Sequence, residues 1–317
     1  MNTLKFVVLV LLMMTLTFST LSCGRGTSKD RTTTQDTTEK DIDTETTSAP
    51  VDNRKRVKVI ILAGQSNAVG HSLLAHLDSQ TMKAYVTGFP SIFVKCCNNP
   101  YLEGQTLTSN GFVRARQGLG LTKSTHFGPE LGMAEVLSKA LPDENIFIIK
   151  AATSGSSIHW DWLLNSGEHG KLLDHMLSFI DEGIQDLESK NLAPEIIGFC
   201  WMQGESDTGS EDSISMYNQK FDGIVKTIET EFSAYLPERG MAVVQAGIST
   251  YWNNYEKMNN VKKQYAEDHP NAYYFDTLDL TYDQDNQDLA HYDAMPMAEL
   301  GRRFGNVILD FLELSSQ

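Results

Sequence analysis

The chain of 317 residues is poor in cysteine, in positive charge and in long apolar runs. It holds four cysteines, of which Cys96 and Cys97 are adjacent and Cys200 lies in an apolar run. Bridging two adjacent cysteines strains the backbone, and a core cysteine behaves as a small apolar residue. The three that follow Cys23 therefore form no disulfide framework, and we expect no metal site from them.

Positive charge is scarce, because 26 Lys and Arg stand against 41 Asp and Glu and the net charge is −15. Phosphate binding requires clustered Lys and Arg. The one basic cluster is residues 54–56, which we expect to flank the first strand. This composition excludes a nucleic-acid partner.

The N-terminal apolar run, residues 6–16, is shorter than the ~20 residues that a membrane-spanning helix needs. Lys5 precedes it, and small residues lead from it to Cys23. This pattern predicts a signal peptide over residues 1–22. Leu21-Ser22-Cys23 also resembles a bacterial lipoprotein cleavage box, which would make Cys23 a lipidated first residue. Plain secretion is the alternative, and both predict an exported protein of the bacterial cell envelope, in the periplasm or on the outer membrane.

Residues 23–53 consist mainly of Thr, Ser, Asp, Glu and Lys. Such a segment cannot bury enough apolar surface to offset the entropy of ordering it. We therefore expect a disordered tether there and a folded domain over residues 54–317.

Short apolar runs alternate with amphipathic helical patterns through the domain. This alternation predicts a parallel sheet with helices on both faces. The fold class is α/β, a three-layer α/β/α arrangement around a mainly parallel five-stranded sheet. We expect a short helix over residues 71–77 and an irregular insert over residues 80–125 that walls a substrate cleft. The five expected strands are residues 57–62, 145–151, 195–202, 240–246 and 271–276.

Polar clusters occur where these strands end, and the ends of parallel strands meet at one edge of a sheet. The sequence around Ser66, taken alone, fits a nucleophile and a polar turn equally well. Its position among four such clusters favours the nucleophile. The clusters are Ser66, Ser154-Gly155, residues 203–205 and residues 288–291.

A serine hydroxyl needs a base to take its proton, and a carboxylate to orient that base. His291 is the candidate base, with Asp288 three residues before it. The rival carboxylates are Asp293, Glu205 and Asp207. We expect the other seven histidines to be structural or at the surface. Among them, a functional role stays most open for His159.

Acyl transfer also needs donors for a tetrahedral oxyanion. The candidates are the backbone amides of Ser66 and Gly155 and the side-chain amide of Gln203. Trp160 and Trp162 follow the Gly155 turn, and each either holds a sugar ring or belongs to the core.

Five sequence blocks resemble, in order, those of the sialate O-acetylesterase-type domain. That family is carbohydrate esterase family 6 of the SGNH hydrolase superfamily. The family often has two glycines where the block of Gly155 begins, and Ser154 replaces the first of them here. Ala68 replaces the last glycine of a G-x-S-x-G elbow, which disfavours an α/β-hydrolase. The blocks are residues 64–67, 127–130, 155–162, 201–207 and 288–293.

The resemblance implies a flavodoxin-like fold and a serine esterase that uses no metal or other cofactor. It implies Ser66 as nucleophile, His291 as base and Asp288 as its partner, with Ser66, Gly155 and Gln203 as the oxyanion hole. Residues expected to bind substrate or to support the site are Gln65, Asn67, Glu205 and Trp160.

The predicted function is removal of O-acetyl groups from sugars, such as acetylated xylan or O-acetyl sialic acid, through an acetyl-enzyme. Two alternatives stay open. One is a non-catalytic glycan-binding lipoprotein on an esterase scaffold, and the other is an esterase of lipids or short acyl chains. The only expected membrane contact is a lipid anchor at Cys23.

Overall fold

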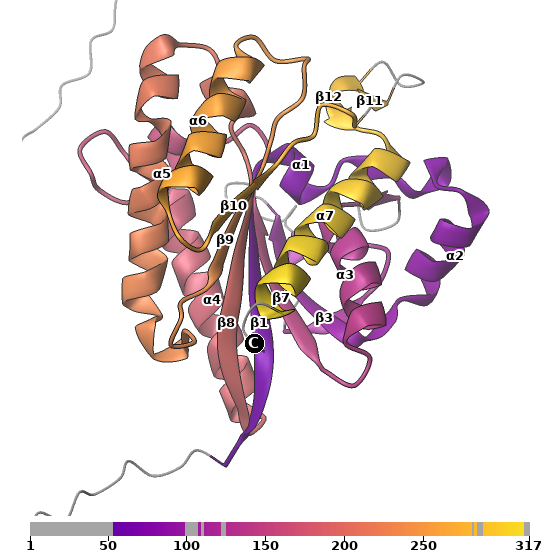
Figure 1. The fold of residues 1–317 in the computed structure, drawn as a ribbon. Helices are drawn as coiled ribbons and strands as arrows, with labels where there is room; N and C mark the ends of the chain where they lie inside the picture. The colour runs from indigo at the N-terminus through magenta and orange to yellow at the C-terminus, as the bar shows by residue number, and fades with distance from the viewer. Residues whose placement is uncertain are drawn as a thin grey trace, which may run out of the picture. The chain divides into compact units, whose positions relative to one another are not determined.

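The computed structural model describes residues 53–98, 107–108, 111–121, 125–280, 282–283 and 288–313. The predicted signal peptide, Cys23 and almost all of the predicted tether lie outside these residues. The described residues form a sheet between two layers of helices (Figure 1). The predicted three-layer α/β/α class is therefore confirmed.

All five predicted strands are present and parallel, and β1 lies between β7 and β8. Residues 59–63 of β1 are completely buried. A strand covered on both faces loses the polar half of the usual alternation, which is why it reads as one apolar run. The strands are β1 (Lys55–Gly64), β7 (Ile146–Ala152), β8 (Leu192–Met202), β9 (Ala242–Ala246) and β10 (Ala272–Phe275).

The sheet is larger than predicted, with eight strands in the order β10-β9-β8-β1-β7-β3-β4 and β5 beside β3. β3 (Phe89–Asn98) lies parallel to β7, inside the segment 80–125 that we had predicted to be irregular. Pro90 is its second residue, and proline is tolerated at the start of a strand. The short strands β4 (Leu107–Thr108) and β5 (Val113–Ala115) pair antiparallel with β3.

Figure 1 shows α3 and α7 on one side of the sheet and α4 and α5 on the other. α3 and α7 cross closely, since a Cβ at Gly132 would lie 2.1 Å from the carbonyl oxygen of Ala298. α6 packs against α5 and β10. The six long helices are α2 (Ser79–Thr87), α3 (Pro129–Ala140), α4 (Lys171–Ser189), α5 (Glu211–Glu231), α6 (Tyr255–Asp268) and α7 (Ala294–Glu313). Within the described ranges, none of the helices has the length and apolar character of a membrane span.

The predicted helix over residues 71–77 is wrong. Ser72–Leu73 forms β2, which pairs with β6 (His126–Phe127), and only a 3-10 turn, η1 (Leu74–His76), follows. The Ser72 hydroxyl donates to the carbonyl of Tyr292 at 2.6 Å. The segment is therefore held by strand pairing and by this long-range contact rather than by helical bonds.

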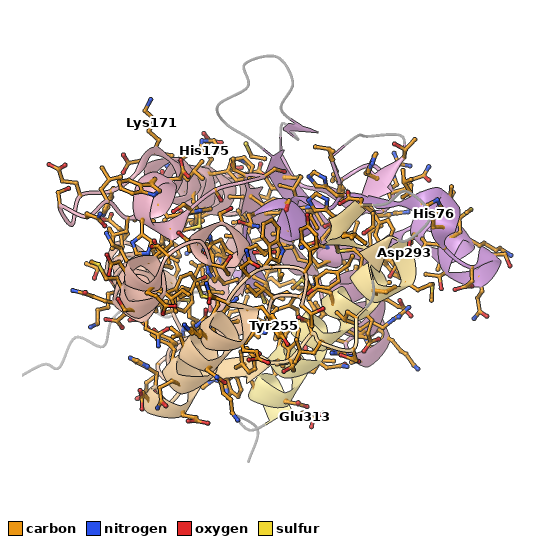
Figure 2. The ribbon with its side chains drawn as sticks, turned by 90° about the horizontal axis from the view of Figure 1, so that it is seen from above. His76, Lys171, His175, Tyr255, Asp293 and Glu313 are labelled. Atoms are coloured by element: carbon orange, nitrogen blue, oxygen red, sulfur yellow. The ribbon has the colours of Figure 1, made fainter. Side chains whose placement is uncertain are left out.

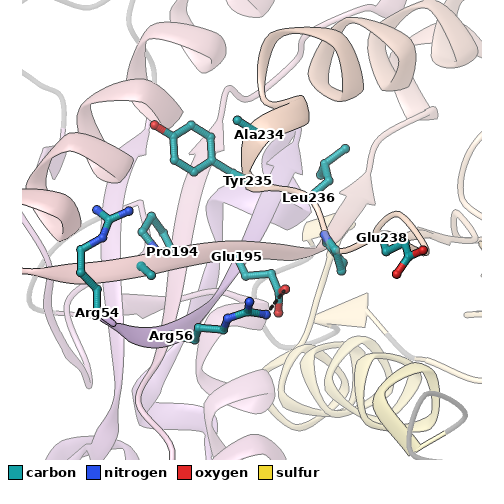
Figure 3. Close-up of a pocket in the computed structure, with 10 residues that line it drawn as sticks. Arg54, Arg56, Pro194, Glu195, Ala234, Tyr235, Leu236 and Glu238 are labelled. Carbon is teal, nitrogen blue, oxygen red and sulfur yellow. Dashed lines mark ion pairs between the residues drawn. The ribbon is translucent and has the colours of Figure 1, made fainter. Parts of the chain in front are cut away.

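The amino edge of the sheet, where β1 begins, has a cavity of about 400 Å³ (Figure 3). Arg54 pairs with Glu188 at 3.1 Å, and Arg56 lies 3.8 Å from Glu195. These charges lie at the surface, where such pairs contribute about 0–1 kcal/mol. The basic cluster was predicted to flank the first strand; Arg54 does precede it, while Lys55 and Arg56 are the first two residues of β1.

Candidate active site

The turn that presents Ser66 depends on Gly64, the last residue of β1. Gly64 has a φ of +140°, and a Cβ there would lie 1.9 Å from the carbonyl oxygen of Met202. The Gln65 amide donates to that same oxygen at 2.8 Å. The short helix α1 (Ser66–Val69) begins directly afterwards. Only a residue without a side chain permits this approach of two strand ends.

Asn67 connects the serine turn to the strand that carries the predicted base. Its side chain donates to the carbonyl of Ala290 at 3.4 Å and accepts from the Tyr292 amide at 3.2 Å. These two residues flank His291 in β12 (Asp288–Tyr292), which pairs with β11 (Tyr282–Asp283). The residue after Ser66 is therefore bonded to both neighbours of His291, although the two are far apart in sequence.

Asp288 orients the His291 ring. Its Oδ2 lies 2.7 Å from His291 Nδ1, and its Oδ1 accepts from the Ala290 amide at 3.2 Å. Burial alone would raise the pKa of Asp288, but the hydrogen bond and charge of His291 and the Ala290 amide hold it below its usual value. A carboxylate at Nδ1 places the ring proton there and leaves Nε2 able to accept a proton.

Within the described residues, the Ser66 hydroxyl makes no hydrogen bond to His291. Catalytic hydrogen bonds are often long before substrate binds. The rival carboxylates have other partners, since Asp293 lies 3.4 Å from His76 (Figure 2) and Asp207 binds the loop that follows Gly155. Asp288 is thus the carboxylate that contacts His291.

Gly155 follows β7 with a φ of +70°, and a Cβ there would meet no atom within 4 Å. The space beside it is open to a substrate, as an oxyanion donor requires. Positive φ is readily adopted only by glycine, so the residue type follows from the turn as well.

Gln203 is completely buried. Its Nε2 donates to the Ser156 carbonyl at 3.0 Å and to Asp207, and its Oε1 accepts from Tyr217 at 2.7 Å. Both amide hydrogens are therefore used inside the protein. These contacts hold the loop after Gly155 in place, and an oxyanion contact by the Gln203 side chain stays a prediction.

Glu205 and Lys262 lie buried behind this turn. Glu205 accepts from Asn67 at 3.0 Å, and burial raises its pKa despite the opposing charge of Lys262. Lys262 donates to the carbonyls of Gln203 and Ala246 at 2.5 Å each. Burial lowers the pKa of Lys262 to about 8, against the attraction of Glu205 and Asp207.

On the other side of Ser66, Lys150 and Glu130 form a fully buried ion pair with 2.7 Å between Nζ and Oε2. Lys150 also donates to the carbonyls of Val69 and Leu119, both at 2.8 Å. The Gly128 amide donates to Glu130 at 3.0 Å. The block at residues 127–130 thus holds the end of α1, a role that the sequence did not reveal.

His71 was predicted to be structural or at the surface, and the structure places it beside the base. Its ring stacks on that of His291, with 3.9 Å between centroids and 20° between planes. Its Nε2 lies 2.8 Å from Ser154 Oγ. Its position five residues after Ser66 was the only signal in the sequence. His159, for which a functional role stayed most open, is buried, and its Nε2 lies 2.8 Å from the carbonyl oxygen of Ser213.

The remaining predicted residues divide between surface and interior. Trp160 is 69% exposed, in the single-turn π-helix η2 (Ile158–Trp162), whereas Trp162 is buried and packs edge-to-face on Trp201. Gln65 is buried and accepts from Ser206 at 2.8 Å. Trp160 is therefore available to a ligand, while Trp162 belongs to the core.

A serine at a strand-to-helix turn, together with a His–Asp pair bonded to that turn through Asn67, is typical of serine ester hydrolases. Residues 56–310 match the sequence profile of the family described as carbohydrate esterase, sialic acid-specific acetylesterase. The chain belongs to this family and is a carboxylic ester hydrolase of the carbohydrate acetylesterase group. A comparison with curated protein sequences finds no match.

Three solved structures have a similar fold. A protein of Arabidopsis thaliana is 18% identical, with a TM-score of 0.59 over 80% of this chain and 98% of its own. NanS is 17% identical, with a TM-score of 0.59 over 82% and 98%. A carbohydrate acetylesterase from Xanthomonas citri is 13% identical, with a TM-score of 0.52 over 78% of this chain and 55% of its own.

Proposed function

We propose that this chain removes O-acetyl groups from sugars with Ser66 as the nucleophile. His291 Nε2 takes the Ser66 proton as Ser66 Oγ attacks the acetyl carbonyl, and Asp288 stabilises the imidazolium that forms. The sugar oxygen then leaves with that proton, and an acetyl-enzyme remains. A water molecule, deprotonated by His291, releases acetate and restores Ser66.

The observation that carries this proposal is the bonding of Asn67 to both neighbours of His291. It fixes the serine turn and the base strand to each other, and a binding protein would have no need of this together with an Asp–His pair. The amides of Ser66 and Gly155 are the backbone donors proposed for the oxyanion.

The proposed substrates are acetylated sugars, with O-acetyl sialic acid and acetylated xylan as the first candidates. The family description names sialic acid, and the similar protein from Xanthomonas citri is called a carbohydrate acetylesterase. The exposed Trp160 lies four residues after Ser156, whose carbonyl accepts from the buried Gln203. Aromatic faces suit sugar rings, so we assign Trp160 to substrate binding.

The test is acetate release from both substrates and from a short synthetic acetyl ester by the parent and by Ser66→Ala. We expect Ser66→Ala to lose release completely, while Ser166→Ala, at an exposed loop, keeps it. Sugar binding without release by the parent would instead support the glycan-binding alternative. Preference for long acyl chains over acetyl would support the lipid esterase.

We also propose export to the cell envelope, with residues 1–22 as signal peptide and Cys23 as a lipid anchor. The support is the sequence pattern alone. Cys23→Ala should move the protein from the membrane fraction to the soluble exported fraction. Equal membrane association of parent and variant would contradict the anchor.

A further inference from the structure

We infer that His71 is a positioning residue that fixes the ring plane of the base His291 and ties it to the Ser154–Gly155 turn. This inference rests on the proposed function, since it concerns the same site. It adds a residue that neither the motif blocks nor the family description assigns.

Asp288 by itself does not fix the His291 ring. One hydrogen bond at Nδ1, of 2.7 Å, sets the direction of the ring edge but leaves the ring free to tilt about that bond. A parallel ring 3.9 Å away restricts that tilt. Edge and face are then both held, and Nε2 is directed to one place.

The second contact of His71 leads to the predicted oxyanion turn. Its Nε2 lies 2.8 Å from Ser154 Oγ, and Ser154 directly precedes Gly155. Base and oxyanion amide are therefore connected through a single side chain. This link requires the hydroxyl of Ser154.

The surroundings of His71 keep it neutral. Burial is the first cause that lowers its pKa to about 3, and the charges of His291, His126 and Lys150 lower it further, while Asp288 raises it. A neutral ring can stack on His291 when that ring becomes an imidazolium, without placing two positive charges face to face. With so low a pKa and with Ser154 at its Nε2, His71 is unsuited to be the base itself.

The experiment compares three variants with the parent. In His71→Ala, the parallel ring over His291 is lost, so the His291 ring can tilt about its bond to Asp288. We expect kcat to fall about 10- to 100-fold because the base is misplaced, with little change in KM.

His71→Phe keeps a stacked ring and loses only the link to Ser154. Its fall in kcat should therefore be smaller than that of His71→Ala. Ser154→Ala should cause a similar fall, and the two changes combined should be no worse than His71→Phe alone. His169→Phe, at a histidine paired with Asp174 in another loop, is the matched control and should behave as the parent.

The NMR shifts of the His291 ring protons provide a readout that does not need activity, because a stacked aromatic ring displaces them. If the parent hydrolyses no ester, the proposed function fails, while ring-proton shifts that change in His71→Ala and stay in His71→Phe would still support the stacking. Unchanged kcat and unchanged His291 ring-proton shifts in His71→Ala would overturn the inference. Activity that survives Ser66→Ala and disappears in Ser154→Ala would also overturn it, because His71 and Ser154 would then be a reacting pair.

Discussion

Two lysines are buried on opposite sides of the Ser66 turn, and their surroundings differ. Lys150 has the Glu130 carboxylate at 2.7 Å as well as two carbonyl oxygens. Lys262 has two carbonyl oxygens and, in the described part of the chain, no ion pair within 4 Å. Both lysines bond to the ends of strands or helices near Ser66. Only Lys150 has a negative charge in direct contact.

The difference shows how a buried charge is accommodated. When two buried charges are paired directly, removing either one strongly lowers the free energy of unfolding, because the other is left as an unpaired buried charge. Lys262 is hydrogen-bonded only to backbone carbonyls, and burial lowers its pKa to about 8 against the more distant attraction of Glu205 and Asp207. Lys150 is therefore held by a charge in direct contact, whereas Lys262 is the lysine whose charge burial weakens.

The largest expected effect is from Lys150→Met, which leaves Glu130 buried and unpaired. We expect a loss of about 3–5 kcal/mol in the free energy of unfolding, measured by urea denaturation. Activity should fall as well, because the carbonyl of Val69 at the end of α1 loses its donor. The double variant Glu130→Leu with Lys150→Met should recover part of this stability, and a double variant less stable than the single one would contradict the account.

Lys262→Met should have a smaller effect. It removes the donor to Gln203 and Ala246, and leaving buried acceptors unbonded costs about 1–3 kcal/mol. The buried charge that the lysine carried at neutral pH disappears at the same time, which offsets part of this cost. Lys263→Met, at the exposed neighbour in α6, is the matched control. A loss as large as that of Lys150→Met would mean that Lys262 has a direct counter-charge after all.

A pH slope also distinguishes the two lysines. Lys262 has a pKa of about 8 when folded, against an ordinary value of 10.5. Between these values the unfolded chain binds more protons, so stability gains up to about 1.4 kcal/mol per pH unit as the pH rises. The burial cost is fully present below pH 8.

The slope is measured by comparing the free energy of unfolding in urea of the parent and the two variants from pH 7 to pH 10. Lys262→Met should lose the contribution, and Lys150→Met should keep it. Equal slopes in the parent and Lys262→Met would show that Lys262 stays charged throughout.

Four of the five predicted strands, β1, β7, β8 and β9, are largely buried, since residues such as 59–63 must all be apolar there. The fifth, β10, lies at the sheet edge and is only partly buried. β3 was missed because Pro90 and Lys95 interrupt its pattern. Lys95 is buried only because its ammonium lies over the ring of Phe179 and pairs with Glu182. Such a contact between a strand and a distant helix leaves no periodic signal.

The catalytic candidates followed from chemistry, because a serine lies just after β1, and a carboxylate and a histidine lie three residues apart after the last strand of the main sheet. What sequence could not supply was the contact network that joins them. Asn67 bonds to residues more than two hundred positions away, and His71 gains its place only when β12 folds over it. Lys150 and Lys262 look like solvent-facing residues until their neighbours are known.

The direction in which β1 runs has a practical consequence. The described chain begins at Asn53 beside the amino edge, and β1 carries it over ten residues to the turn at Ser66 (Figure 1). At about 3.3 Å per residue, that is roughly 33 Å. A resin or electrode coupled through residues before Asn53 would therefore hold the protein by the end opposite its reactive groups, and polymeric sugars could approach them freely.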